Sequence, residues 1–209
     1  MKVLIVDDHA LVRRGVMYLL QESFKDVEVG EAGDARAGLE AVVGQPWDLI
    51  VVDISLPGRN GLELIREIKL AKPELPILVI SGHPENDYAL RALKLGAAGF
   101  VSKQSAADVL VTAVKRVISG RRYISPSLAE HLAGAISGES PGASHETLSD
   151  RELQVLRFIA SGKTIKEISA ELALSPKTIA TYRSRIAEKM GLSSNVEFTR
   201  YAMQHGLVD

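Results

Sequence analysis

Three aspartates of the sequence stand where carboxylates could bind a cation and accept a phosphoryl group. Asp53 follows the wholly apolar run 49–52 and shortly precedes Pro57, which cannot continue a strand. Asp7 and Asp8 follow a second apolar run of the same kind. Such runs, rich in β-branched residues, are typical of buried parallel strands. If the two strands belong to one parallel sheet, the three carboxylates lie together at one edge of it.

A cluster of three carboxylates needs a cation, because the negative charges otherwise repel one another. Oxygen ligands at this density suit Mg²⁺, which keeps several waters and leaves positions open for phosphate oxygens. A single Asp at a strand end is more often a turn residue or a helix cap. The cluster, and not any one of its members, therefore predicts a Mg²⁺ site that supports phosphoryl chemistry.

The elements that must position these residues are strands and helices in alternation. Apolar runs of β type are separated by segments of helical period, and they cover 2–6, 27–29, 49–52, 77–80 and 99–101. This pattern predicts a doubly wound α/β fold, with a five-stranded parallel sheet of flavodoxin-like type covered by helices on both faces. Ligands bind at the carboxyl ends of the strands in this class. Ser81 and Lys103 follow two further predicted strands at that same edge.

These strand-end residues suggest a division of chemical labour. Asp7 and Asp8 would hold the metal, directly or through water, and Asp53 would be the nucleophile that accepts the phosphoryl group. Ser81 could then donate a hydrogen bond to a phosphate oxygen, and Lys103 could pair with Asp53 or with the phosphoryl group. Singly, a serine here is more often a turn residue and a lysine more often solvated. Their joint placement at successive strand ends favours the functional interpretation.

The strand-end residues resemble the receiver domain of bacterial two-component response regulators over about 1–119: Asp7, Asp8, Asp53, Ser81 and Lys103. The resemblance implies that the backbone carbonyl of Ser55 is a further metal ligand. It also implies that Phe100 is an aromatic switch residue, although a buried core role fits Phe100 equally well.

Composition changes after the last predicted helix of this domain, which ends at Gly120. We expect 120–146 to be a linker with room for a short helix at 127–136. The stretch 137–144 is rich in Gly, Ser and Pro and has no apolar period. The sequence therefore predicts two domains, a receiver over 1–119 and a second domain over 147–209.

The second domain is predicted to be smaller and all-α. Ser149 can cap a helix, and Glu152, three residues on, completes a capping box. Gly162 ends that helix, a second one follows, and Pro176 stands at the start of a third, which runs to Met190. Two helices joined by a short turn, with such residues at their boundaries, indicate a helix-turn-helix, whose second helix enters the DNA major groove.

The predicted recognition helix, 176–190, has an apolar and a basic face. Ile179, Ile186 and Met190 recur at helical intervals and should pack inward. The helix carries a net charge of +3, which fits phosphate contact, although a charged helical face is often merely solvated. We expect the base-edge contacts to come from Ala180, Thr181 and Ser184. The full set of predicted DNA-binding residues is Lys177, Thr178, Ala180, Thr181, Arg183, Ser184, Arg185 and Lys189.

The segments 148–156, 162–169, 174–179 and 189–191 resemble the LuxR-type helix-turn-helix, with coverage of 147–209. Together, the two domains resemble a response regulator of the NarL/FixJ family. That resemblance implies a sensor histidine kinase as partner, phosphorylation of Asp53 and a resulting shift of receiver conformation. It further implies a homodimer formed through the last helix, 195–205, and control of dimerisation and promoter DNA binding.

Two alternatives stay open. A Mg²⁺-dependent phosphohydrolase with an Asp nucleophile would place a second Asp two residues later as general acid, but Ser55 stands there. We therefore expect no enzyme activity beyond slow self-dephosphorylation and no catalytic residues. The second alternative is a regulator that ignores phosphate and binds DNA constitutively, or that responds to a protein partner. The complete acidic site argues against it, but intact residues do not by themselves prove that a kinase exists.

The remaining composition excludes several classes. The 209 residues contain no Cys, so disulfide frameworks, thiolate metal sites and Cys nucleophiles are excluded. The first apolar run is too short for a signal segment or a membrane span, and we expect a cytoplasmic protein with no membrane partner. His9 is interpreted as a surface or helix-start residue, since the sequence shows no partners that would make it a metal ligand.

Overall fold

The computed structural model describes residues 1–208 except 58–59, 83–84, 106 and 131–143. The chain divides into two compact units, Met1–Ala133 and Gly134–Asp209. Residues 131–143 of the predicted linker, which include all of the Gly/Ser/Pro stretch except Ser144, lie outside the described residues. Among the described residues, no helix combines the length and the apolar character that a bilayer crossing requires.

The first unit is built on a five-stranded sheet with the strand order β2-β1-β3-β4-β5. All four strand pairs are parallel. The strands are β1 Lys2–Val6, β2 Glu28–Ala32, β3 Leu49–Asp53, β4 Ile77–Ser81 and β5 Gly99–Ser102. Each predicted apolar run lies in or overlaps one of these strands, so the predicted doubly wound fold is confirmed.

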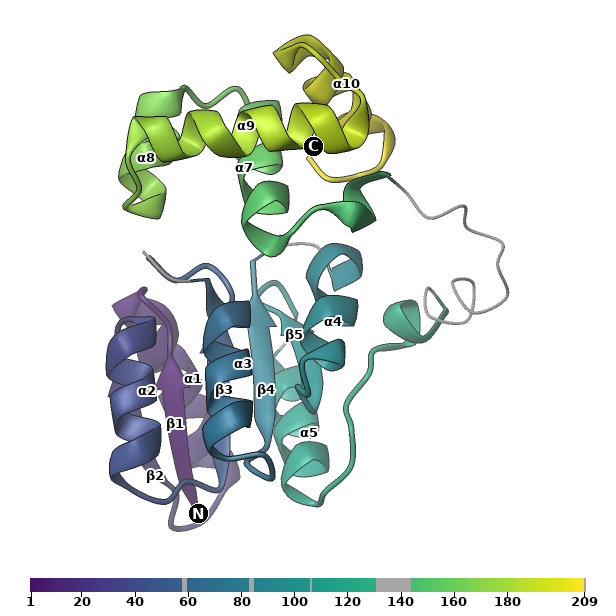
Figure 1. Cartoon of the computed structure of the whole chain (residues 1–209). Coiled ribbons are helices and arrows are strands. Elements are labelled where there is room, and N and C mark those ends of the chain that lie inside the picture. Colours follow the sequence, from purple (N-terminus) through teal and green to yellow (C-terminus); the bar gives the residue numbers. More distant parts are fainter. Residues whose placement is uncertain (58–59, 83–84, 106, 131–143, 209) are drawn as a thin grey trace. The chain divides into compact units, whose positions relative to one another are not determined.

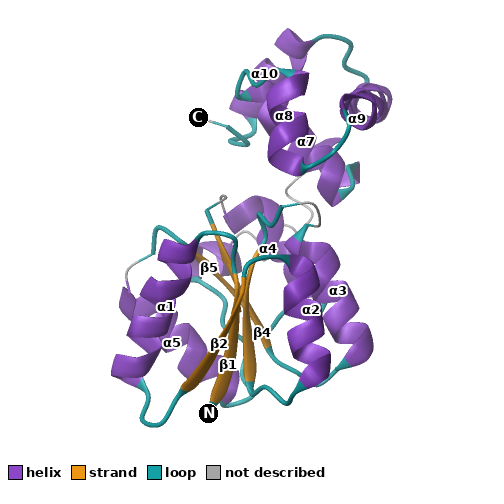
Figure 2. Cartoon of the chain, turned by 90° about the vertical axis from the view of Figure 1, so that its left-hand side faces the viewer, coloured by secondary structure: helices purple, strands orange, loops and turns teal. Residues whose placement is uncertain are grey.

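Helices cover both faces of this sheet (Figures 1 and 2). They are α1 Ala10–Ser23, α2 Ala35–Gly44, α3 Gly61–Ala71, α4 Glu85–Lys94 and α5 Ala107–Ile118. Figure 2 shows α1 and α5 on one face and α2 and α3 on the other. Because both faces are covered, the central strands need apolar side chains in both directions, which explains their continuous rather than alternating hydrophobicity.

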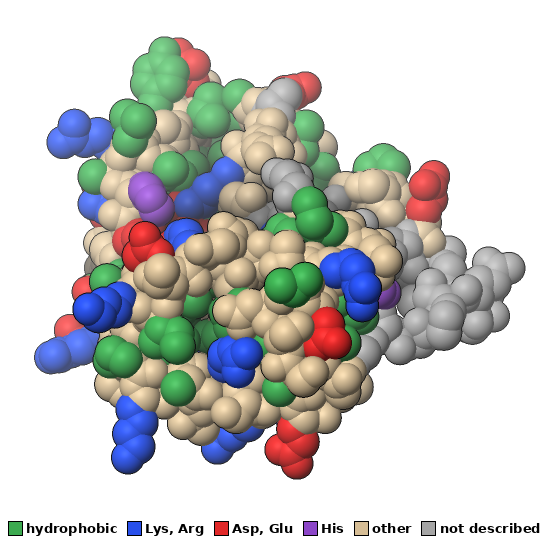
Figure 3. All heavy atoms as spheres, turned by 90° about the horizontal axis from the view of Figure 1, so that it is seen from above, with side chains coloured by type: hydrophobic (Ala, Val, Ile, Leu, Met, Phe, Trp, Pro, Cys, Tyr) green, Lys and Arg blue, Asp and Glu red, His purple; other side chains and the backbone are tan. Residues whose placement is uncertain are grey.

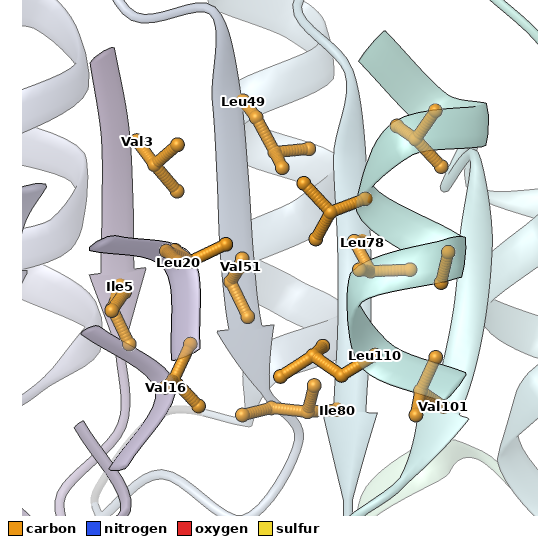
Figure 4. Close-up of a cluster of buried hydrophobic side chains, with 13 residues drawn as sticks. Val3, Ile5, Val16, Leu20, Leu49, Val51, Leu78, Ile80, Val101 and Leu110 are labelled. Atoms are coloured by element: carbon orange, nitrogen blue, oxygen red, sulfur yellow. The ribbon is translucent and has the colours of Figure 1, made fainter. Parts of the chain in front are cut away.

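The core on the α1 and α5 face joins side chains from four strands (Figure 4). Val51 and Leu78 of the central strands are fully buried, as is Leu20 of α1. Full burial of such a side chain stabilises the fold by about 1.5–3 kcal/mol relative to exposure. The core therefore fixes the register of the strands whose ends carry the predicted site.

The chain that leaves α5 stays attached to the sheet. The backbone N–H of Tyr123 donates to the carbonyl of Ala98 at 2.9 Å, and Tyr123 forms a parallel bridge with Gly99 at the outer edge of β5. A Cβ atom on Gly99 would lie 2.9 Å from the carbonyl oxygen of Tyr123, so the close approach requires glycine. Residues 126–130 are helical, and the rest of the predicted short helix lies outside the described residues.

The second unit is helical. It contains the 3₁₀ turn η1 Ser144–Thr147, followed by α7 Asp150–Ala160, α8 Ile165–Leu172, α9 Pro176–Met190 and α10 Asn195–Gln204. The predicted capping box of Ser149 and Glu152 is confirmed, and Thr164 with Glu167 forms another. Helices α8 and α9 are joined by a turn in which Ala173 adopts the left-handed conformation, with φ of 51°. The predicted helix-turn-helix is therefore present as α8–turn–α9.

Candidate functional site

The acidic residues converge at the carboxyl end of the sheet. Val6 of β1 lies opposite Val52 of β3, so the next residues, Asp7 and Asp53, are brought side by side. Both side chains are fully buried, whereas Asp8 is partly exposed. Asp7, Asp8, His9 and Asp53 each offer a ligand atom, and these atoms lie within 4.8 Å of one another. The strand register has thus built the predicted cluster.

Lys103 balances the charge of the two buried aspartates. Its Nζ donates a hydrogen bond to Asp53 Oδ2 at 2.8 Å and lies 2.7 Å from Asp7 Oδ2. Its backbone N–H donates to the carbonyl of Ser81 at 2.7 Å, which holds the lysine at the end of β5. Burial lowers the pKa of Lys103, but the carboxylates of Asp53 and Asp7 raise it by more. The lysine is therefore held as a cation between the two aspartates.

The environment of Asp53 suits a metal ion and an incoming phosphoryl group. Burial raises the pKa of Asp53, and the neighbouring Lys103 opposes this only in part, so the pKa lies above its ordinary value. Among the described residues, Asp53 Oδ1 has no hydrogen-bond partner although it is buried. An uncompensated buried carboxylate oxygen is costly, and a bound cation would satisfy it. The hard oxygen donors of this cluster fit Mg²⁺.

The other predicted receiver residues lie on β4, on β5 and in the loop after β3. Ser81 is fully buried at the end of β4, next to β5. Phe100 is fully buried on β5, opposite Val79, which establishes its place in the core and leaves a switch role as a prediction. Ser55 lies two residues beyond Asp53 and is half-buried.

Sequence reasoning missed the support that Asn60 and Gly61 give to the loop after Asp53. Asn60 is fully buried and caps α3, because its Oδ1 accepts a hydrogen bond from the N–H of Leu62 at 3.0 Å. A Cβ on Gly61 would lie 2.1 Å from the carbonyl oxygen of Asp53, so only glycine fits. An Asn-Gly pair before an apolar helical period was the available signal.

Two more residues missed as site residues adjoin Asp7 and Asp8. Arg13 Nη1 donates to the carbonyl of Asp7 at 2.7 Å, and its Nε donates to Glu31 at 2.8 Å. His9 Nδ1 lies 2.8 Å from Asp8 Oδ1. The prediction that His9 is a surface or helix-start residue is confirmed, because it is the N-cap of α1 and its side chain is exposed; its contact with Asp8 was not foreseen.

The predicted DNA-binding residues of α9 fall into two groups. Five are exposed on one side of the helix, while Ile179 and Ile186 are buried on the other; the five are Lys177, Ala180, Thr181, Ser184 and Arg185. The hydroxyl of Thr181 donates to the carbonyl of Lys177 at 3.0 Å, and that of Ser184 donates to the carbonyl of Ala180 at 3.1 Å. Both hydroxyl oxygens keep acceptor capacity toward solvent.

The side chains of the second group contact other side chains of the same domain. Arg183 Nε donates to Asn195 Oδ1 at 2.9 Å, and Lys189 Nζ donates to Glu152 Oε2 at 2.6 Å. Thr178 Oγ1 lies 2.8 Å from Ser175 Oγ at the helix cap. Contacts of Thr178, Arg183 and Lys189 with DNA stay predictions. On the face shown in Figure 3, Lys and Arg side chains are spread singly and do not form one continuous basic patch.

Comparisons with known proteins agree with this arrangement. Residues 3–115 match the response regulator receiver domain, and residues 146–202 match the luxR family of bacterial regulatory proteins. The chain is 38% identical to the response regulator UvrY of Escherichia coli strain K12, over 98% of this chain and 94% of that protein. It is 36% identical to the response regulator GacA of Pseudomonas aeruginosa strain PAO1, over 100% of this chain and 98% of that protein.

A solved structure of similar organisation is RcsB from Salmonella enterica serovar Typhimurium, bound to the promoter rprA in the presence of the phosphomimetic BeF3-. Its TM-score is 0.66 at 29% identity, over 97% of this chain and 98% of that chain. The chain therefore has a receiver domain followed by a luxR-family domain, and it aligns with these relatives over nearly their whole length. The chain belongs to the NarL/FixJ family of response regulators, which join a receiver domain to a LuxR-type DNA-binding domain.

Proposed function

We propose that this protein is a transcriptional regulator of a two-component system whose DNA binding is controlled by phosphorylation of Asp53. The observation that carries the proposal is the environment of this carboxylate. Asp53 is fully buried, its Oδ2 accepts a hydrogen bond from Lys103 at 2.8 Å, and no side chain among the described residues donates to its Oδ1. A structural aspartate would have both oxygens satisfied, whereas a phosphoacceptor needs one oxygen available.

In the proposed reaction, a carboxylate oxygen of Asp53 attacks the phosphorus of a phosphohistidine on the partner kinase. The new O–P bond forms as the N–P bond breaks, and the imidazole leaves with the electron pair of that bond. Asp7, Asp8, Asp53 and the backbone carbonyl of Ser55 would hold Mg²⁺, which when bound supplies positive charge that neutralises the phosphoryl oxygens.

The negative charge of the phosphoryl group would interact with residues at the ends of the neighbouring strands. Ser81 would donate a hydrogen bond to a phosphoryl oxygen, and the ammonium of Lys103 would pair with another. Movement of Ser81 and of Phe100 on β5 would bias the receiver between two conformations. We propose that this change promotes homodimer formation through α10 and promoter binding through α9. The BeF3- and promoter named for the RcsB structure support a receiver coupled to DNA binding.

DNA contact is proposed for the exposed side of α9. Ala180, Thr181 and Ser184 would meet base edges, and Lys177 and Arg185 would meet phosphates. The alternation of short side chains with flanking cations suits a helix lying in a major groove, because short side chains allow close approach.

We propose that the site turns over its phosphate only slowly and that the protein is not a phosphohydrolase. Ser55 stands two residues after Asp53, where a phosphohydrolase of this kind would need a carboxylic acid to protonate the leaving group. Sustained turnover of a generic phosphate ester would contradict this proposal.

The decisive experiment measures oligomeric state and promoter affinity of the full chain with Mg²⁺, before and after addition of a small phosphoryl donor or beryllofluoride. Asp53→Ala is the control, because it removes the acceptor and keeps Asp7 and Lys103. We expect dimer formation or tighter DNA binding in the wild-type protein only. Unchanged values with an occupied site would show that the acidic site is uncoupled from DNA binding, and would favour constitutive binding or control by a protein partner.

A further inference from the structure

Two histidines from distant parts of the second unit meet at Tyr201. His205 stacks on the ring of Tyr201, and the centres of these two rings are 4.0 Å apart. His145, which lies in η1, packs against both rings in a T-shaped arrangement. Its ring centre is 5.9 Å from that of Tyr201 and 5.7 Å from that of His205. Two imidazoles are thus close together at a place to which the proposed function assigns no role.

A hydrogen bond to the backbone fixes the protonation of the His205 ring. Its Nδ1 lies 2.9 Å from the carbonyl oxygen of Tyr201, and it must be the donor because a carbonyl oxygen only accepts. In the neutral ring of His205 the lone pair is therefore on Nε2. Histidines that bind metals ordinarily donate their other ring N–H to a carbonyl or a carboxylate in this way. His205 is thus prepared to bind a cation through Nε2.

Tyr201 also positions the second imidazole. Its hydroxyl oxygen accepts a hydrogen bond from the backbone N–H of His145 at 3.2 Å and lies 3.0 Å from Nδ1 of the same residue. One tyrosine therefore orients both histidines. Two imidazoles that bind one ion through bonds of about 2.0–2.1 Å have their ring centres about 5–6 Å apart. The observed separation of 5.7 Å falls in this range.

Exposure and ligand type indicate which ions suit this pair. His205 is exposed and His145 is half-buried, so an ion and its water molecules can reach the two rings. Among the described residues, no further histidine or carboxylate completes the pair, and a bound ion would keep water ligands. Imidazole suits Zn²⁺, Cu²⁺ and Ni²⁺, whereas Mg²⁺ and Ca²⁺ prefer oxygen. The chain contains no Cys that would compete for these ions.

We propose that His145 and His205 together bind one late first-row divalent ion, such as Zn²⁺ or Cu²⁺, and that this ion ties η1 to α10. An ion that binds only the folded domain stabilises it. Positions 201 and 205 share one side of α10, whereas the exposed Val196 and Met203 share another. The ion therefore leaves the exposed apolar side of α10 open. The site belongs to the second unit alone and does not depend on phosphorylation of Asp53.

The first test follows the histidine side chains of the wild-type full chain by ¹⁵N NMR while Zn²⁺ is added. We expect the Nε2 resonance of His205 and one nitrogen resonance of His145 to shift together, with a single midpoint. An unshifted His205 Nε2, or two different midpoints, would overturn the proposal. Because each residue is followed separately, Zn²⁺ that binds the acidic cluster of the receiver does not affect the result.

The second test measures Zn²⁺ affinity when one histidine is removed. His145→Gln and His205→Gln should each weaken binding at the remaining imidazole about 10²-fold or more, because the second ligand no longer acts within the same molecule. His9→Gln removes a histidine of the receiver, so it is the matched control and should leave the midpoint of the pair unchanged. A wild-type midpoint in either of the first two variants would show that the histidines bind separately, and would overturn the proposal.

A third measurement tests the tie between η1 and α10. Zn²⁺ should raise the hydrogen-exchange protection of both segments in the wild-type chain and in His9→Gln, and not in His145→Gln or His205→Gln. The same experiment without Zn²⁺ shows whether each variant keeps a folded second unit. If Zn²⁺ shifts the imidazole resonances but leaves protection of η1 and α10 unchanged in the wild type, the proposed tie is wrong.

Discussion

The acidic end of the receiver sheet and the exposed side of α9 both depend on charged residues, but they hold those charges in opposite ways. Asp7 and Asp53 are fully buried and share one lysine. On α9, by contrast, Lys177 and Arg185 are exposed. Buried charges interact strongly and are costly to leave unpaired, whereas exposed ones are screened by water and salt. The receiver site should therefore respond to substitution through stability, and α9 should respond through DNA affinity.

The largest expected effect comes from removing the shared cation. Lys103→Met leaves two buried carboxylates without their partner, and the free energy of unfolding of the receiver should fall by about 3–5 kcal/mol without metal. Mg²⁺ should restore part of the loss, because a dication replaces the ammonium. Urea unfolding followed by fluorescence of the single tryptophan, which lies in the receiver, measures both values. Lys25→Met, at an exposed position, is the control. If Lys103→Met lowers the free energy of unfolding by less than about 1 kcal/mol, the buried charges of the receiver stabilise the protein no more than exposed ones do.

A second effect tests whether the site depends on close backbone packing. Gly61→Ala places a methyl group against the carbonyl of Asp53 and should destabilise the receiver by about 1–3 kcal/mol, because the loop must shift. It should also weaken phosphoryl acceptance by moving Asp53. Gly44→Ala, where a Cβ meets no atom within 4 Å, is the matched control and should not destabilise. The same tryptophan signal compares the two variants, and equal stabilities would show that the loop adapts freely.

The second domain also contains a buried carboxylate that is paired with a lysine, namely Glu152 with Lys189. Burial raises the pKa of Glu152, but hydrogen bonds from Lys189 and Ser149 lower it by more, so it lies below its ordinary value. Its stabilising contribution is present above the unfolded-state pKa of about 4.3 and is lost as the pH falls through the lower folded-state pKa. At neutral pH, Glu152→Gln should cost about 1–2 kcal/mol.

Hydrogen exchange of α7 and α9 measures this effect separately from the receiver. Wild-type protection should fall on acidification more steeply than that of Glu152→Gln, which has no carboxylate to titrate at this position. Glu188→Gln, on the exposed side of α9, should behave like wild type. Parallel acid profiles for the wild type and Glu152→Gln would exclude the ion pair as a source of stability.

Sequence reasoning succeeded where backbone topology decides position. Parallel strand register alone brings Asp7 beside Asp53, so their convergence followed from apolar runs that end in aspartate. It could not predict contacts within the protein that side-chain rotamers decide, because the period of a helix assigns a face but not a partner. Lys189 was assigned to DNA phosphates, yet its flexible stem reaches Glu152, 37 positions earlier in the chain. The contact of His9 Nδ1 with Asp8 was likewise not predicted, because it depends on the rotamer of one exposed side chain.

The smallest expected effect distinguishes Lys177, which is predicted to contact DNA phosphate, from Lys189, which pairs with Glu152. Lys177 is exposed at the start of the helix, so Lys177→Ala should weaken promoter binding by about 1 kcal/mol or less and reduce the slope of log affinity against log salt by about 1, with stability unchanged. Lys189→Ala should instead reduce hydrogen-exchange protection at the α7–α9 contact, because Glu152 loses its cation. If Lys189 also contacts phosphate, its salt slope will fall by the same amount as that of Lys177. If the slope stays at the wild-type value while protection falls, Lys189 acts within the domain and the DNA-binding face of α9 is narrower than its charge suggests.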